Sequence, residues 1–435
     1  MERTSEQSDP PALPLQGATT TAARHLFVRR WLAPVLLAIS LQLTIRQHSW
    51  APGSTLPVAT ANIAMLAATL FLLCHLLDAA RPRMSSPVVV ILSALALSVA
   101  FSTVASDDPS RSFTRLRLYL CIALLGISFY LIHRDPGHRI PLTPYLAAIG
   151  LLHLPYVAEV TFWMRDAGGV FWTEDVRVPH FSNVRHFAQL CFLAASCSLA
   201  VALTCRRLAF SGFAVTCVAL FGILATGSRG ALLAWIIFAG LLAGMARRKW
   251  LTCLLAAAAL VLSAAIVWHL HSTGLLESPN LFARMISSGT EDISSGRNHI
   301  WIDSLAEIAE RPFFGHGPEA YRISGCCNRA VFQSHNFVLQ FLMEFGIVGC
   351  ALFLLLAWKL VSGLGGPMRI WRAATSCTGT AVLLSMLGAF LAFAMIDGLL
   401  YHPVPLMAFA MICGLLAASL SNPDAARQGT TREAS

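Results

Sequence analysis

The chain contains a long series of apolar segments, each about as long as a membrane-spanning helix. A helix needs roughly 20 apolar residues to cross a bilayer, and the sequence holds twelve such segments. Since 56% of the 435 residues are hydrophobic and only 12% are charged, a soluble fold is excluded. The pattern predicts an all-α bundle of about 12 transmembrane helices. The predicted spans are 31–47, 56–79, 87–104, 114–133, 143–163, 186–204, 208–226, 230–246, 251–270, 335–358, 373–396 and 403–420.

Basic residues gather at every second connection between these segments. The positive-inside rule places those connections and both termini in the cytoplasm. The other connections, including a long hydrophilic insert, then face outward, into the periplasm of a cell with two membranes. The predicted organisation is a cytoplasmic tail (1–30), nine spans (31–270), a periplasmic loop with short amphipathic helices (271–334), three spans (335–420) and a cytoplasmic tail (421–435).

The composition of the insert limits what it can bind. It carries five arginines and seven carboxylates, so nucleic-acid binding through counterion release has no support. Phosphate binding would need particular arginines. Only Cys326 and Cys327 of the twelve cysteines lie in the insert, and no spacing fits a zinc site. An aspartate-rich DxD motif is also absent. We therefore expect no metal and no cofactor.

Within the insert, Arg297 to Glu310 has the pattern of an amphipathic helix. Trp301, Leu305 and Ile308 recur at helical spacing and predict its apolar face. Arg297 would lie in the first turn, where a cation is unfavourable unless an anion binds there. The alternative is an ion pair with Glu291 or Asp292, and the local pattern leaves both interpretations open.

His335 and Asn336 begin the tenth predicted span. His335 is a titratable base at the mouth of the insert, and its chemistry suits proton transfer near neutral pH. Asn336, Gln340 and Glu344 are spaced by four residues and share one helical face. For Gln340 and Glu344 the sequence favours interhelical hydrogen bonding, with Gly346 and Gly349 allowing a neighbouring helix to approach.

Other polar residues lie at the outer ends of predicted spans. Arg229 follows a glycine turn between spans seven and eight, where it either binds an anion or snorkels to the interface. Arg185 opens the sixth span and is a weaker candidate. His316 lies in a second glycine turn, where histidines are usually bystanders. Asp397 and His402 flank the last outer loop and are secondary candidates for a cavity lining.

Several of these motifs, in this order, resemble the O-antigen ligase and polymerase superfamily. The resemblance covers roughly residues 160–420. It is carried by Thr226-Gly227-Ser228-Arg229-Gly230-Ala231, Gly296-Arg297-Asn298 with Trp301, Phe314-Gly315-His316-Gly317, His335-Asn336 with Leu339-Gln340, and Glu344-Phe345-Gly346-Ile347-Val348-Gly349.

The resemblance implies a membrane glycosyltransferase of the bacterial inner membrane, acting on the periplasmic face. Such enzymes take a glycan from undecaprenyl diphosphate. By position, Arg229 and Arg297 correspond to the family's essential arginines, which would bind the diphosphate, and His335 to its essential histidine. We expect metal-independent, inverting transfer, because arginines can stabilise the leaving diphosphate and His335 can act as the base. Lower-ranked site residues are Arg185, Asn336, Gln340 and His316.

The acceptor distinguishes the members of the superfamily. The leading prediction is an O-antigen ligase, which transfers the glycan to lipid A-core. A polymerase and a protein O-oligosaccharyltransferase remain alternatives, although the compact insert disfavours the second. A lipid-glycan transporter fits twelve spans, but the polar groups lie at the outer face instead of midway. A structural subunit whose insert docks a partner is the remaining alternative. The expected partners are the lipid-linked glycan, its acceptor and membrane lipids, with no nucleic acid.

Overall fold

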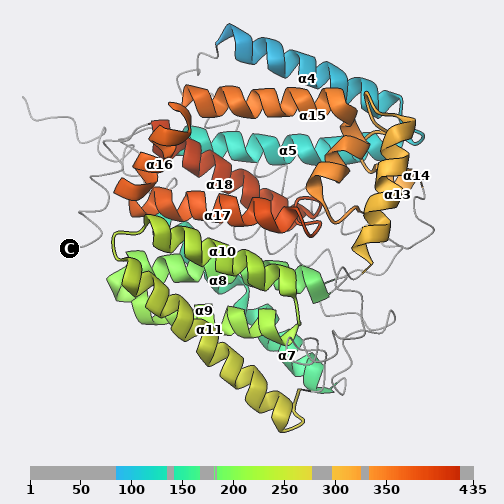
Figure 1. The fold of residues 1–435 in the computed structure, drawn as a ribbon. Coiled ribbons are helices and arrows are strands. Elements are labelled where there is room, and N and C mark those ends of the chain that lie inside the picture. Colours follow the sequence, from blue (N-terminus) through green and yellow to red (C-terminus); the bar gives the residue numbers. More distant parts are fainter. Residues whose placement is uncertain are drawn as a thin grey trace, which may run out of the picture.

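A computed structural model describes residues 85–134, 142–166, 181, 184–276, 296–324 and 333–421. Every regular element within these ranges is a helix, and Figure 1 shows most of the long helices packed side by side. The predicted all-helical class is therefore confirmed for this part of the chain. The predicted spans 31–47 and 56–79, Glu291, Asp292 and the cysteine pair of the insert lie outside the described residues.

The long helices follow the predicted apolar segments closely. The predicted span 143–163 forms two helices separated at His153, and the predicted span 373–396 is divided at Cys377 between α16 and α17. The helices that match the predicted spans are α4 (Ser86–Val104), α5 (Pro109–Arg134), α6 (Leu142–Leu152), α7 (Leu154–Asp166), α8 (Val184–Thr204), α9 (Ala209–Ala225), α10 (Arg229–Met245), α11 (Lys249–Ser272), α15 (Phe337–Gly363), α17 (Thr378–Ala394) and α18 (Pro403–Ser421). The remaining helices are η3 (Arg206–Leu208), α13 (Arg297–Glu310), α14 (Ala320–Ser324) and α16 (Gly366–Ser376).

Length and hydropathy identify seven of the described helices as candidate membrane spans. Two further apolar helices, α10 and α17, are 17 residues long and fall just below that length. The chain is thus a multi-pass membrane protein, while the full count of twelve spans stays a prediction.

The core of the bundle forms around α8. This helix is buried along most of its length, and most of its buried residues are alanine, serine, cysteine or leucine. It packs against α6, α9 and α10, while α5 packs on α18 and α10 on α17. Small side chains let helix backbones approach closely, which is the main source of helix association in a membrane.

Helix α15 breaks at Gly346, whose φ of 64° is not helical. The turn after α13 occupies the break. The amides of His316 and Gly317 donate to the carbonyls of Met343 and Glu344 at 2.8 and 2.9 Å. In return, the amides of residues 347 and 348 donate to the carbonyls of residues 312 and 313 at 2.8 and 3.1 Å. Gly346 thus lets a neighbour approach as predicted, although the neighbour is the backbone of this turn and not another helix.

Helix α13 has the predicted bounds and lies across the ends of the long helices, at the right of Figure 1. Its predicted apolar face is partly wrong. The buried residues are Ile300, Ser304 and Ile308, whereas Leu305 is 54% exposed. The helix thus packs through a row spaced by four residues, in contact with α15.

Candidate functional site

Four of the predicted site residues lie at the starts of four helices. Arg229 and Arg297 are the first residues of α10 and α13, Arg185 is the second residue of α8, and His335 lies two residues before α15. A helix N-terminus carries a partial positive charge and free amide donors, so each of these starts favours a bound anion. Together with Asp397 from the α17–α18 loop, these residues form what we call the convergent site.

His335 and Asp397 form the centre of this site. His335 Nδ1 lies 3.2 Å from Asp397 Oδ1, which also accepts the amide of Gly398 at 2.8 Å. Burial of Asp397 raises the pKa of its carboxyl. The hydrogen bond and charge of His335, with the charges of Arg297 and Arg185, outweigh burial and lower that pKa to about 2. Asp397 is therefore ionised at neutral pH and orients the imidazole.

The three arginines of the convergent site lie close enough to act on one another. Burial lowers the pKa of Arg297; Asp397 opposes this effect, and repulsion from Arg185 and Arg229 adds to it. An arginine nevertheless keeps its charge in a protein. The Nε of Arg297 is buried and has no hydrogen-bond partner among the described residues. An anion is the kind of ligand that such an unpartnered buried donor would bind.

The turn that carries His335 is held from both sides. His335 itself has a φ of 53°, a left-handed conformation that costs a non-glycine residue energy. On the preceding residue, Ser334, the amide donates to Gln340 Oε1 at 3.2 Å, and the carbonyl accepts from the indole of Trp301 at 3.0 Å. Since Trp301 lies one turn after Arg297 on α13, the insert helix links the arginine and the histidine mechanically.

The lower-ranked candidates differ in how they meet this site. Asn336 caps α15 by accepting from two backbone amides at 2.9 and 3.2 Å, and it donates to the carbonyl of Met395 at 3.1 Å. Gln340 connects Ser334 to Glu344, to which it donates at 2.6 Å. The ring of His316 is bonded to the carbonyl of Glu307 at 2.8 Å, so it fastens the glycine turn to α13. In this structure all three contact the backbone around the site.

Asp397 and His402 were only secondary candidates in the sequence, although Asp397 contacts His335 directly. His402 is buried against the ring of His186, with ring centres 3.8 Å apart, and accepts from Gln333 Nε2 at 3.1 Å. A signal was present, because Asp397 is the only carboxylate between residues 345 and 421. An isolated ionisable group in an apolar region often marks a functional site.

The same region was searched for a metal site. No group of three or more histidine, cysteine, aspartate or glutamate side chains in the described part of the chain could hold a metal ion. The donors that converge are nitrogen cations, which suit phosphate.

The fold and these residues define a class: a multi-pass membrane protein with arginines at helix starts and a histidine–aspartate pair. Comparison with known families gives the particular group. Residues 213–354 match the profile of the O-antigen ligase family. The resemblance seen in the motifs is thereby confirmed for this segment, which holds Arg229, Arg297 and His335 and is similar to the O-antigen ligase family. A comparison with curated proteins found no match.

Proposed function

We propose that this protein transfers a glycan from undecaprenyl diphosphate to an acceptor hydroxyl and is an O-antigen ligase, with lipid A-core as the acceptor. The observation that carries the proposal is the convergent site, where three arginines and four helix starts surround an oriented histidine. Cations held in position beside a base are what transfer from a diphosphate requires.

Arg229 and Arg297 bind the diphosphate in this proposal, and Arg185 adds a third cation. The bond between the anomeric carbon and the diphosphate oxygen breaks, and its electron pair leaves with the diphosphate. The resulting negative charge is stabilised by guanidinium groups that are already in position. The partial positive charges at the helix starts also stabilise the leaving diphosphate.

His335 is the general base. Its Nδ1 faces the ionised Asp397, so Nδ1 carries a proton and the lone pair remains on Nε2. Nε2 accepts the proton of the acceptor hydroxyl while that oxygen forms a bond to the anomeric carbon. Attack from the face opposite the diphosphate inverts the anomeric centre.

The family and the lipid-linked donor support a location in the bacterial inner membrane with the convergent site on the periplasmic side. The described connections agree with this orientation. The basic residues 206–207 lie between α8 and α9, at the opposite end of α8 from Arg185. The basic residues 247–249 lie at the junction of α10 and α11, at the opposite end of α10 from Arg229. In this orientation, residues 1–30 and 421–435 are cytoplasmic tails and residues 271–334 are a periplasmic loop.

The test is transfer by purified protein in liposomes. Wild-type protein receives undecaprenyl-diphosphate-linked glycan and lipid A-core, and the product is followed by gel mobility and mass. We expect His335→Ala to abolish transfer. The matched control is His299→Ala, which removes an exposed histidine of α13 and should leave transfer unchanged. Near-normal transfer by His335→Ala would contradict the assignment of the base.

The acceptor separates the ligase from the polymerase of the same superfamily. A strain that lacks this chain is analysed for the glycans on its lipid core. Loss of a ligase leaves polymer on the carrier lipid, whereas loss of a polymerase leaves single repeats on the core. Loss of glycan from proteins would instead indicate the protein-glycosylating branch.

A further inference from the structure

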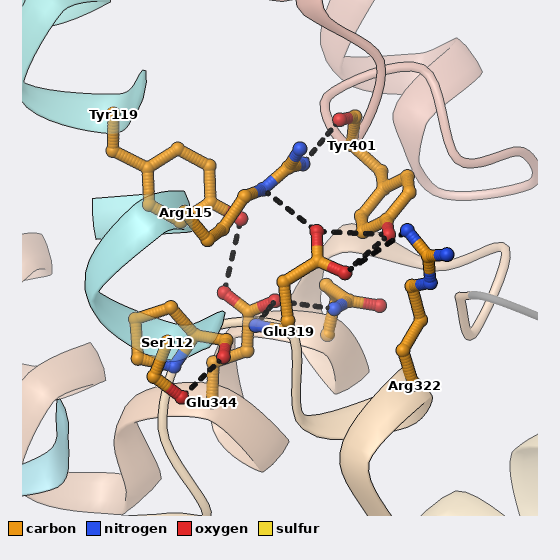
Figure 2. A network of polar contacts seen from close by, with 9 residues as sticks. Ser112, Arg115, Tyr119, Glu319, Arg322, Glu344 and Tyr401 are labelled. Atoms are coloured by element: carbon orange, nitrogen blue, oxygen red, sulfur yellow. Dashed lines mark hydrogen bonds and ion pairs between the residues drawn. The ribbon is translucent and has the colours of Figure 1, made fainter. Parts of the chain in front are cut away.

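A second group of charged residues lies at the same end of the molecule, on one face of α5. Ser112, Arg115 and Tyr119 share this face. Ser112 and Arg115 contact the turn at residues 318–319, Arg115 also contacts Tyr401, and Tyr119 contacts Glu344. Figure 2 shows these three residues with their four labelled partners. We call this group the α5 network; it consists of Ser112, Arg115, Tyr119, Glu319, Arg322, Glu344 and Tyr401.

Arg115 is the hub of the α5 network. Its side chain is 8% exposed and forms an ion pair with Glu319, with Nε 3.5 Å from Oε1. A terminal nitrogen of its guanidinium donates to the carbonyl of Tyr401. The guanidinium also lies over the rings of Tyr119 and Tyr401, 4.8 and 4.2 Å from their centres. A buried cation is thus surrounded by a carboxylate, a carbonyl and two aromatic faces.

The two glutamates of the network accept hydrogen bonds from the α17–α18 loop, from α5 and from α15. Glu319 accepts from the hydroxyl of Tyr401 at 3.0 and 3.1 Å and pairs with Arg322 at 3.7 Å. Glu344 accepts from the hydroxyl of Tyr119 at 3.0 Å, from Gln340 at 2.6 Å and from the amide of Glu319 at 3.3 Å. Ser112 donates to the carbonyl of Pro318 at 2.7 Å.

The segments held in this way are those that carry the convergent site. Tyr401 lies four residues after Asp397 in the α17–α18 loop. Glu344 holds Gln340, and Gln340 accepts the amide of Ser334 directly before His335. Two chains of contacts therefore run from α5, one to each member of the histidine–aspartate pair. The two non-glycine residues with positive φ in the described chain, Glu319 and His335, lie at points on these chains.

We propose that the α5 network is a positioning device, in which Tyr119 with Glu344 sets the place of His335 and Tyr401 with Glu319 sets the place of Asp397. The assignment rests on the proposed function, because it takes the histidine–aspartate pair as the reacting centre. The network touches the pair through other residues and has no part in diphosphate binding. Its loss should therefore reduce turnover and leave the affinity for the lipid donor unchanged.

The variants Tyr119→Phe and Tyr401→Phe test this proposal, since each removes one hydroxyl and keeps the ring that contacts Arg115. The matched control is Tyr145→Phe. Tyr145 is fully buried in the bundle core, and its hydroxyl has no hydrogen-bond partner among the described residues. We expect kcat to fall several-fold in each single variant and about 100-fold in the double variant, with KM for the lipid donor unchanged. Tyr145→Phe should match the wild type.

A second readout does not depend on activity. Diethyl pyrocarbonate modifies accessible histidine nitrogens, and mass spectrometry gives the rate at each residue. In the double variant we expect faster modification of His335 and an unchanged rate at the exposed His299. Unchanged kcat, or unchanged reactivity of His335, would overturn the positioning role, as would a loss of turnover that only follows the amount of folded protein. If wild-type protein transfers no glycan, the proposed function fails, while the modification rates still test the network.

Discussion

Arginine is used in two different ways at the same end of this bundle. In the α5 network, Arg115 and Arg322 face Glu319 and Glu344, and Arg115 contacts a carboxylate, a carbonyl and two rings. In the convergent site, the charges of Asp397, Arg185 and Arg229 act on Arg297, and the Nε of Arg297 lacks a hydrogen-bond partner within the described residues.

This difference distinguishes a structural cluster from the proposed binding site. In the α5 network the Nε of Arg115 lies 3.5 Å from the carboxylate of Glu319, so the network fixes the positions of the segments that contribute to it. In the convergent site the buried Nε of Arg297 has no partner among the described residues, and a ligand that accepts its hydrogen bond would remove that cost. The comparison predicts large functional effects for one set of arginines and little effect for arginines at the surface.

The largest effect is expected from Arg297→Ala. Removing one preorganised cation from a developing negative charge should reduce transfer about 100-fold to 1,000-fold, or roughly 3–4 kcal/mol. The control is Arg311→Ala, which removes an exposed arginine that pairs with Asp107 at 2.7 Å on the same side of the molecule. That surface pair contributes little energy, so this variant should retain transfer. Equal losses in both variants would remove the distinction between the two kinds of arginine.

The next largest effect is expected on the stability of α15, the helix broken at Gly346, which contacts both the convergent site and the α5 network. A Cβ on Gly346 would lie 2.4 Å from the backbone carbon and oxygen of Phe313, and its φ of 64° already disfavours other residues. Gly346→Ala should therefore destabilise the protein by about 2–3 kcal/mol. Gly363→Ala in the same helix meets nothing within 4 Å and should keep or slightly raise stability. Thermal unfolding in detergent measures both, and an equally stable Gly346→Ala protein would contradict the backbone contact described here.

A smaller effect follows from the carboxylate of the convergent site. The pKa of Asp397 is lowered to about 2 in the folded protein, below its ordinary value of about 4. Its charge therefore stabilises the fold by about 2 kcal/mol above pH 4, and this contribution is lost as the pH falls from 4 towards 2. Asp397→Asn should unfold at a lower temperature than wild type at pH 7. The gap should be about halved near pH 3 and should close towards pH 2, and a constant gap would contradict an ionised Asp397.

The smallest expected effect is that of a chelator. If guanidinium groups alone balance the leaving diphosphate, EDTA should leave the transfer rate unchanged. The measurement compares initial rates with EDTA and with added magnesium. Strict dependence on magnesium would show that the arginines of the convergent site are insufficient to stabilise the leaving diphosphate.

The sequence predicted the local features of this molecule well. Hydropathy located the described long helices to within a few residues, because a helix in a bilayer must be apolar over its whole length. The bounds of α13 followed from Pro312 and the pattern of charges. The residues of the convergent site could be named since most of them occupy helix starts, where glycine turns and polar residues interrupt an apolar sequence.

Features that depend on contacts between distant segments were not predictable in the same way. The break at Gly346 is stabilised by a turn 30 residues earlier in the chain. The local sequence around Gly346 is typical of a continuous helix with small residues, so it does not indicate the break. The pairing of His335 with Asp397 spans 62 residues. The exposed side of α13 could not be assigned either, because Leu305 and Ile300 are both apolar and only packing against α15 decides between them.

The α17–α18 loop has a consequence for how the protein comes into being. Asp397 and Tyr401 lie between α17 and α18, so they are synthesised after the arginines and the histidine. A nascent chain that stops before this loop therefore lacks the carboxylate that contacts the imidazole of His335. Under the proposed function, we expect such a truncated product to be inactive in the membrane.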